Sequence, residues 1–354
     1  MLRHPDILMT KRVEVLSEAA SMDADERLDQ RRRAHHALAT RLAGMSDAAL
    51  AALLTEPDPA RASLFGNQSE VIEVEGAKVF VKKIALTDLE RAGAEGATAN
   101  LFDLPLFCRY ELGFGAWREL SACLRASAWA RSGECALFPL VHHWRVLPRA
   151  PTPGNPELEA RLQRALDHWQ RSQAIAARVD ALWGASASLV LFLEYVPQML
   201  FAWLTDRRGA ELPDAATEAA ILRFHDEWRE AQAFMNARGM LHFDLHAANL
   251  MTDGAQVYVS DYGLALCADF DLAPAERAFF ASHRLYDRGY VDWAFGLWLR
   301  QPPLTPALEA RLASVAPVAD IFARFVGELN GVSKTTPFPA AEMEAALAAT
   351  GASR

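Results

Sequence analysis

Residues 240–266 constrain this chain most, because short apolar runs alternate there with oxygen-bearing side chains. The sequence MLHFDLHAANLMTDGAQVYVSDYGLAL places two acids, Asp244 and Asp261, and one amide, Asn249, on loops beside short strands. Catalytic groups concentrate on loops that a rigid scaffold holds. Carboxylate and amide oxygens are also ligands that Mg²⁺ accepts in proteins. The segment therefore predicts a metal site with a further carboxylate that can accept a proton from a hydroxyl.

A β-rich region is expected upstream of this segment. Ile72 and Val74 alternate with glutamates, the two-residue period of a half-buried strand. Gly76 then supplies a turn into a second β-branched run at 78–84, which predicts a hairpin. The elements expected after the hairpin are a helix at 116–130, a strand at 136–141, a helical stretch at 155–184 and an apolar strand at 188–196.

The second half of the chain is expected to be mostly helical. A helix with one apolar face ends at Gly239, a hairpin turns at Asp253-Gly254, and further helices follow from about Glu276. Residues 1–60 are charged and helical in pattern, with Asp23 or Ser21 as the expected cap of a first helix. This predicts an α+β fold in three regions: an extension at 1–60, a β-rich part at 61–196 and a helical part at 197–354.

Composition narrows the class of protein. The 354 residues carry a formal net charge of -9, which argues against a nucleic-acid-binding surface, since such surfaces show basic patches. No apolar run reaches the ~18 residues that a membrane span needs, and no signal-peptide core is present at the start. The four cysteines lie far apart, a pattern typical of reduced thiols. We therefore expect a cytoplasmic protein that binds neither nucleic acid nor membrane.

The spacing of the polar residues in the central segment resembles that of the protein-kinase-like superfamily. His242 and Asp244 are followed five residues later by Asn249, and the tripeptide Asp261-Tyr262-Gly263 follows that. The resemblance implies a bilobal fold, with a small antiparallel β-rich N-lobe that carries helical insertions and a larger α-helical C-lobe. It implies ATP and Mg²⁺ as cofactors, Asp244 as catalytic base, and Asn249 and Asp261 as metal ligands. His242 would be a structural residue of the loop.

The strand VFVKKI adds a cationic residue to this resemblance. It is similar to the kinase strand that carries the phosphate-binding lysine, which makes Lys82 the candidate and Lys83 its solvent-facing neighbour. In that family the lysine pairs with a helix glutamate. Glu119 is the better candidate for this partner, with Glu111 as the alternative.

The strand LVLFLEYVP resembles the kinase segment that leads into the hinge. Leu193 would be the gatekeeper, and the backbone carbonyl of Glu194 and the N–H of Val196 would meet the adenine edge. The donor must precede Pro197, because proline has no N–H. The resemblance also implies nucleotide contacts at Met251 and at the backbone of Gly66.

Several positions depart from the protein-kinase pattern. The glycine-rich loop is reduced to Gly66, and Phe80 either stacks on adenine or fills the adenine pocket. Phe243 replaces the arginine through which activation-loop phosphorylation acts. His246 gives the D-x-H pattern of aminoglycoside- and choline-kinase-type enzymes. Little chain separates Gly263 from the next helix, so a long activation segment is not expected.

These observations predict a kinase that transfers the γ-phosphoryl group of ATP to a hydroxyl acceptor. The acceptor is either a small molecule or a protein. The alternatives are a pseudokinase that acts as a nucleotide-sensing scaffold, or a related enzyme that transfers AMP. Asp292-Trp293 with Gly296 resembles the Asp-x-Trp-x-x-Gly helix of kinases but is one residue short, so Asp287 is the alternative. A homo-oligomer is left open.

Overall fold

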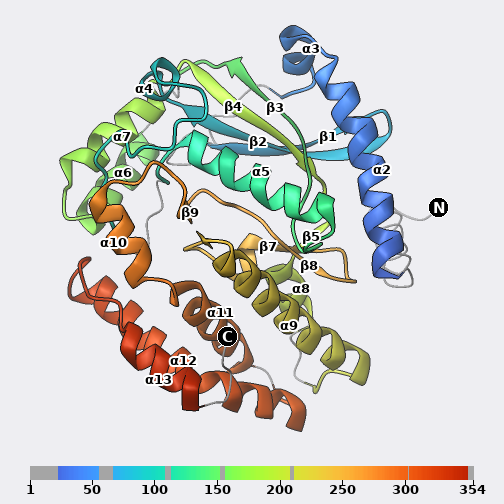
Figure 1. The fold of residues 1–354 in the computed structure, drawn as a ribbon, viewed down its shortest axis with the longest axis vertical. Coiled ribbons are helices and arrows are strands. Elements are labelled where there is room, and N and C mark those ends of the chain that lie inside the picture. Colours follow the sequence, from blue (N-terminus) through green and yellow to red (C-terminus); the bar gives the residue numbers. More distant parts are fainter. Residues whose placement is uncertain are drawn as a thin grey trace.

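The computed structural model describes residues 23–55, 67–107, 113–151, 156–207, 211–301 and 303–349. The chain is a mixed α/β protein with an antiparallel four-stranded sheet in the order β1-β2-β4-β3. Helices of the second half lie below this sheet in Figure 1, and helix α5 (Ala116–Ser132) crosses between the two. One hydrophobic core runs from the sheet through α5 into the lower helices.

The sheet begins with the predicted hairpin. Strands β1 (Gln68–Val74) and β2 (Ala77–Leu86) are joined by a turn in which Glu75 and Gly76 have φ values of 51° and 83°. Strand β2 also pairs with β4 (Ala187–Glu194), which places it inside the sheet. The hairpin and the apolar strand were therefore predicted correctly.

The predicted strand at 136–141 is wrong, because β3 begins at Val141 and continues to Pro148 (Val141–Pro148). The carbonyls of Ala136 and Phe138 accept hydrogen bonds from a side chain of the N-terminal segment instead of a neighbouring strand. Pro139 has no N–H to contribute to a ladder. The carbonyls of Leu137 and Leu140 do accept N–H groups of strand residues, Val259 and Glu194, but these isolated bonds form no continuous ladder.

The helical stretch predicted at 155–184 forms α6 (Pro156–His168) and α7 (Gln173–Trp183) between β3 and β4. The side chain of Arg178 in α7 forms a buried ion pair with Glu90 of α4 (Asp88–Ala92), with a shortest N–O distance of 2.9 Å. Glu90 also accepts a hydrogen bond from the N–H of Ala116, the first residue of α5. The insertion therefore packs on the sheet and fixes the start of α5.

The N-terminal segment forms α2 (Ala24–Ala43) and α3 (Asp47–Ala52), capped by Asp23 and Ser46. Figure 1 shows α2 along one flank of the sheet, and it packs against β3. His35 of α2 and His142 of β3 are both buried, with 3.2 Å between their Nδ1 atoms. The charged pattern of α2 would place His35 on the surface, but its contact with His142 buries it.

The second half of the chain is helical, as predicted. Its small strands pair locally, β7 with β5 and β8, and β6 with β9. The elements are α8 (Leu200–Asp206), α9 (Ala215–Ala237), α10 (Pro274–Ser282), α11 (Tyr286–Leu299), α12 (Pro306–Gly331), α13 (Ala340–Ala349), η2 (Ala247–Asn249), β5 (Gln198–Met199), β6 (Met240–Leu241), β7 (Leu250–Thr252), β8 (Val257–Val259) and β9 (Leu266–Cys267).

Two further properties bear on the expectations from the sequence. Among the described residues, no helix is long and apolar enough to cross a membrane. Cys123, Cys135 and Cys267 are buried free thiols, as the cysteine spacing predicted.

Candidate active site

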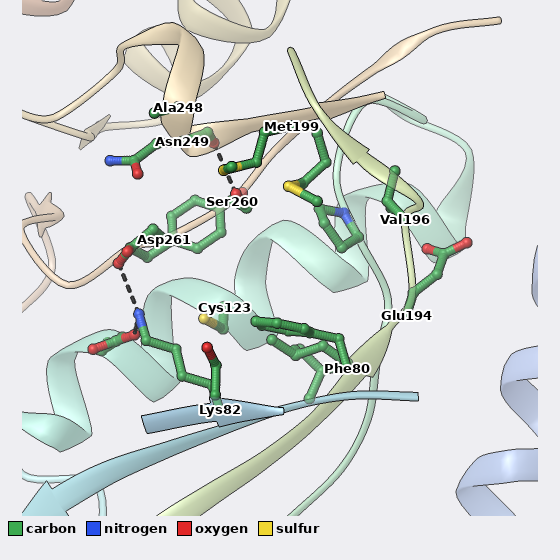
Figure 2. Close-up of a pocket in the computed structure, with 17 residues that line it drawn as sticks. Phe80, Lys82, Cys123, Glu194, Val196, Met199, Ala248, Asn249, Ser260 and Asp261 are labelled. Carbon is green, nitrogen blue, oxygen red and sulfur yellow. Dashed lines mark hydrogen bonds and ion pairs between the residues drawn. The ribbon is translucent and has the colours of Figure 1, made fainter. Parts of the chain in front are cut away.

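A cavity of about 320 Å³ lies between the four-stranded sheet and the β7–β8 hairpin. Figure 2 shows side chains from β2, α5, the end of β4 and the hairpin segment around it. Most of the predicted nucleotide and metal residues line it. The lining residues are Ser69, Phe80, Lys82, Glu119, Cys123, Pro139, Val141, Leu193, Glu194, Val196, Met199, Ala248, Asn249, Met251, Ser260, Asp261 and Tyr262.

At one end of the cavity, Lys82 lies between two carboxylates. Its Nζ atom is 2.6 Å from Oε1 of Glu119 on α5 and 2.7 Å from Oδ1 of Asp261 (Figure 2). Lys83 points to the other side of β2 and pairs with Glu70 at 2.8 Å. Strand alternation accounts for the difference, because successive side chains of a strand face opposite ways. Lys82, the candidate from the sequence, therefore lines the cavity, and Lys83 does not.

The pKa values of Lys82, Asp261 and Glu119 depend on one another and on burial. Burial alone would lower the pKa of the Lys82 ammonium, but the Asp261 and Glu119 carboxylates together raise it. Burial would likewise raise the pKa of Asp261, and the adjacent Lys82 instead lowers it. Glu119 is nearly inaccessible, and burial raises its pKa despite the attraction of Lys82. Lys82 is therefore a fixed cation, and Asp261 is a fixed anion that faces the cavity.

The loop between β6 and η2 carries Asp244, which Asn249 holds in place. The Nδ2 atom of Asn249 donates to Oδ2 and to the backbone oxygen of Asp244, at 2.8 and 2.9 Å. His242 is fully buried and donates from Nε2 to the carbonyl of Ser260, at 3.0 Å. This bond ties the loop to the residue before Asp261. The predicted structural place of His242 in the loop agrees with these contacts.

Two residues of this region adopt a backbone conformation that is rare outside glycine. Phe243 has φ 61° and Asp261 has φ 62°. Such positions cost of order 1–3 kcal/mol each and persist only where the surroundings fix them. Asp287 of α11, with no exposed surface, accepts the N–H groups of His242 and Phe243, at 2.7 and 2.8 Å. Of the two aspartates that the sequence left open, Asp287 is the one at the loop, while Asp292 pairs with Arg229 and Arg288.

A histidine and a tyrosine approach the second oxygen of Asp244. The Nδ1 atom of His246 accepts the N–H of Ala248, at 3.1 Å, so Nε2 carries the proton of the neutral ring. That Nε2 lies 3.5 Å from Oδ1 of Asp244. The hydroxyl of Tyr290 donates to the same oxygen, at 3.3 Å. Burial would raise the pKa of Asp244, but His246 and His242 lower it, which keeps the carboxylate ionised.

The other end of the cavity is apolar. Phe80, Leu193, Val196 and Met251 all line it, as predicted, and Met199 joins them with nearly half of its surface exposed. Figure 2 shows the sulfur of Met199 close to this apolar group. A mostly apolar cavity with a few convergent polar groups at one end is the usual form of a small-molecule site.

The sequence missed some residues of the site and assigned others that lie outside the described part of the chain. Gly66 and Glu111 belong to the latter group. The lining residues that the sequence did not assign are Ser69, Cys123, Pro139, Val141, Met199, Ala248 and Ser260, and Tyr290 was missed beside Asp244. Cys123 had a usable signal, because it follows Glu119 by four residues and so shares its helix face.

The donor set at the polar end fits a hard divalent cation. Asn249 uses its Nδ2 atom toward Asp244, so its Oδ1 is left to face elsewhere, and Figure 2 shows its amide and the Asp261 carboxylate extending to the same side. Within the described residues, no group of three or more His, Cys, Asp and Glu side chains is arranged as a metal site. A cation here would complete its shell with water or phosphate oxygens, as Mg²⁺ commonly does.

Comparison with known proteins adds no assignment. No protein-family model matches this chain, and neither does any curated protein sequence.

Proposed function

We propose that this chain is a bilobal, protein-kinase-like phosphotransferase that uses ATP and Mg²⁺ and phosphorylates a hydroxyl. The observation that carries the proposal is the position of Lys82 between Glu119 and Asp261, within 2.7 Å of each. A fixed cation and a fixed anion at the polar end of an apolar cavity suit a nucleotide whose triphosphate reaches that end. The four-stranded sheet with α5 would be the small lobe, and the helical second half the large lobe.

The nucleotide would lie with its base at the apolar end. Phe80, Leu193 and Met251 offer flat or flexible apolar surface to a purine. The base edge would meet the backbone carbonyl of Glu194 and the N–H of Val196, and Lys82 would neutralise phosphate charge as a point cation. Asn249 and Asp261 would hold Mg²⁺, which neutralises charge that develops on the phosphoryl oxygens.

Asp244 would accept the proton of the acceptor hydroxyl. It stays ionised because of His246 and His242, and its Oδ2 is fixed by Asn249. A base of low pKa is effective here because this transfer depends mostly on positioning and charge neutralisation. The Nε2 atom of His246 lies 3.5 Å from Oδ1 of Asp244, and with nucleotide bound its N–H would donate to a phosphoryl or acceptor oxygen next to that carboxylate.

Both acceptor classes stay open in this proposal. Phe243 packs against Phe279 and Tyr286, with ring centroids 5.5 and 5.0 Å away, where a phosphorylation-responsive kinase would carry arginine. Helix α10 begins at Pro274, eleven residues after Gly263, which leaves a short connecting segment. These features favour a site that needs no activation-segment modification, and they suit a small-molecule acceptor.

The test combines binding and transfer. Calorimetric titration of the purified chain with MgATP should give saturable binding, and incubation with γ-labelled ATP should release or transfer the label. Asp261→Asn should abolish transfer, while Asp269→Asn, a surface aspartate paired with Arg125, should leave it unchanged. MgATP binding without transfer would favour the nucleotide-sensing scaffold, and absence of MgATP binding at millimolar concentration would contradict the proposal. An adduct with the mass of AMP would favour AMP transfer.

A further inference from the structure

Arg31 of helix α2 makes four hydrogen bonds at the end of the cavity opposite Lys82. Its Nε and Nη2 atoms donate to the two carboxylate oxygens of Glu194, at 2.8 and 2.9 Å. Nη1 and Nη2 also donate to the carbonyls of Ala136 and Phe138, at 2.7 and 2.6 Å. The two side chains are only 10% and 17% exposed. A bidentate pair of this kind fixes geometry as well as charge.

Glu194 is the last residue of β4 and lines the cavity, and its carboxylate is the group that Arg31 binds. Figure 2 shows its carboxylate directed away from Phe80 and Lys82. The carboxylate also accepts the N–H of Leu140, at 2.9 Å, and the Glu194 N–H donates to the carbonyl of Leu140, at 2.8 Å. The peptide at this position is therefore fixed by its own backbone, by Leu140 and by Arg31.

The same guanidinium also contacts the β7–β8 hairpin, through a residue that does not itself line the cavity. Its carbon lies 4.8 Å from the ring centre of Tyr258 on β8, whose hydroxyl donates to Asp253. Strand β8 pairs with β7, which carries Met251. Arg31 thus bridges the end of β4 and the β7–β8 hairpin, the two segments that lie on either side of the apolar end.

We propose that Arg31 is a positioning residue for the nucleotide base, and that α2 belongs to the catalytic unit and not to a separate extension. This inference rests on the proposed function, because it takes the apolar end as the purine site. Arg31 would act through Glu194, by holding its backbone carbonyl where it accepts a hydrogen bond from the 6-amino group of adenine. It would not touch the nucleotide itself.

A 6-oxo purine gives the means to separate this role from general stability. Inosine triphosphate carries an oxygen where ATP carries the 6-amino group, so it cannot donate to the Glu194 carbonyl. Displacement of that carbonyl should weaken ATP binding and leave inosine triphosphate binding nearly unchanged. A variant that only loosens the fold should weaken both nucleotides alike.

The experiment titrates the full chain with MgATP and Mg–inosine triphosphate, by calorimetry and well below the melting temperature. Arg31→Ala should weaken MgATP binding about tenfold, the loss expected for the one hydrogen bond between the 6-amino group and the Glu194 carbonyl, and inosine triphosphate binding by less than about twofold. Arg31→Lys keeps the positive charge but loses the paired donors of the guanidinium. Its affinity for MgATP should lie between those of the unmodified chain and Arg31→Ala. The control is Arg32→Ala, which removes a neighbour that donates to the Arg131 carbonyl on the protein surface.

A second variant covers the case in which Arg31→Ala folds poorly. Glu194→Gln keeps the size of the side chain and should weaken the binding of MgATP more than that of Mg–inosine triphosphate. Combined with Arg31→Lys, it should weaken MgATP binding no more than either change alone. Equal loss of both nucleotides, additive losses, or unchanged ATP binding would overturn the role of Arg31. Failure of the unmodified chain to bind MgATP would instead overturn the proposed function, and this inference with it.

Discussion

The carboxylate of Asp287 accepts the backbone N–H groups of both His242 and Phe243, at 2.7 and 2.8 Å. This single contact joins α11 to the loop that carries Asp244. Burial raises the pKa of Asp287 to about 6, although the two N–H groups lower it. A buried carboxylate is tolerated there because it stabilises a loop with Phe243 at positive φ.

Asp287→Asn should therefore reduce phosphoryl transfer more than it reduces stability. An amide has one acceptor atom and directs its NH₂ group toward a backbone N–H, which costs about 1–3 kcal/mol at the loop. We expect the transfer rate to fall about 10- to 100-fold. Label transfer from γ-labelled ATP measures the rate, and thermal denaturation measures stability.

The matched control is Asp292→Asn on the same helix. Asp292 is buried and paired with Arg229 and Arg288, so this change should lower the melting temperature. It should leave the transfer rate of the folded fraction unchanged. Equal loss of rate in both variants would mean that Asp287 acts only through stability.

Lys82→Met should abolish transfer and destabilise the chain, because Glu119 and Asp261 would face each other without a cation. Removal of one partner of a buried pair costs about 3–5 kcal/mol of stability. Because Asp261 is partly exposed in the cavity, we expect a loss near the lower of these values. The double variant Lys82→Met with Glu119→Gln should recover much of the stability without recovering transfer. Urea denaturation measures the stability, and a double variant no more stable than Lys82→Met would contradict the charge account.

The site was predictable where its residues are close in sequence or follow a fixed period. Residues 242–263 supply most of the polar end from one loop and one hairpin. The resemblance of VFVKKI to a kinase strand singled out Lys82, and the two-residue period of β2 explains why Lys83 faces the other side. Glu119 and the strand end at Glu194 also lay in recognisable local patterns, a helix face and an apolar strand.

The remaining contacts depend on residues far apart in the chain. Arg31 and Glu194 are separated by 163 positions, and the helix pattern of α2 shows only a charged face at Arg31. The apolar residues at 136–140 suggested a strand, because nothing local reveals that their carbonyls bind Arg31. Tyr290 lies 46 positions after Asp244 and has the same pattern as an ordinary core aromatic of α11.

Tyr290→Phe should lower the transfer rate without changing the affinity for MgATP. The hydroxyl donates to Oδ1 of Asp244 from helix α11, and Tyr290 is not among the residues that line the cavity. Loss of one hydrogen bond to a charged group predicts a rate about tenfold lower. Calorimetry and single-turnover label release give affinity and rate separately. Tyr286→Phe, one turn earlier on α11, is the control and should retain the rate.

The His35–His142 contact should make stability depend on pH. Burial, with smaller effects of His35 and Arg31, lowers the pKa of His142 to about 4, although Glu194 opposes the change. The unfolded chain takes up this proton near pH 6.5, so stability falls as the pH drops from about 6.5 toward 4. By about pH 5 the loss should reach about 1–2 kcal/mol.

A variant isolates this contribution from the other titrating groups. His225 and His283, with pKa values of about 4, act in the same direction, while Glu227, with a pKa of about 7, acts in the opposite one. The His142→Gln variant retains these three groups, so their contribution is the same in both proteins. Its glutamine side chain can still form a hydrogen bond with His35. Urea denaturation at about pH 7.5 and about pH 5 should show a smaller loss in the variant. An identical loss in both proteins would place the titration elsewhere.

Gly113 should tolerate no side chain, because it passes against the backbone of Gly263. A Cβ atom on Gly113 would lie 2.6 Å from the Gly263 carbonyl oxygen, and its φ of 64° is itself unfavourable for other residues. Gly96 has φ 78° but would meet nothing within 4 Å. Gly96→Ala should therefore cost only the conformational term of about 1–2 kcal/mol, whereas Gly113→Ala should also displace Gly263 and the neighbouring Asp261. We expect a marked loss of label transfer in Gly113→Ala and near-normal transfer in Gly96→Ala, with both followed by thermal denaturation. Equal transfer in the two variants would show that the close approach of Gly113 to Gly263 does not hold Asp261 in place.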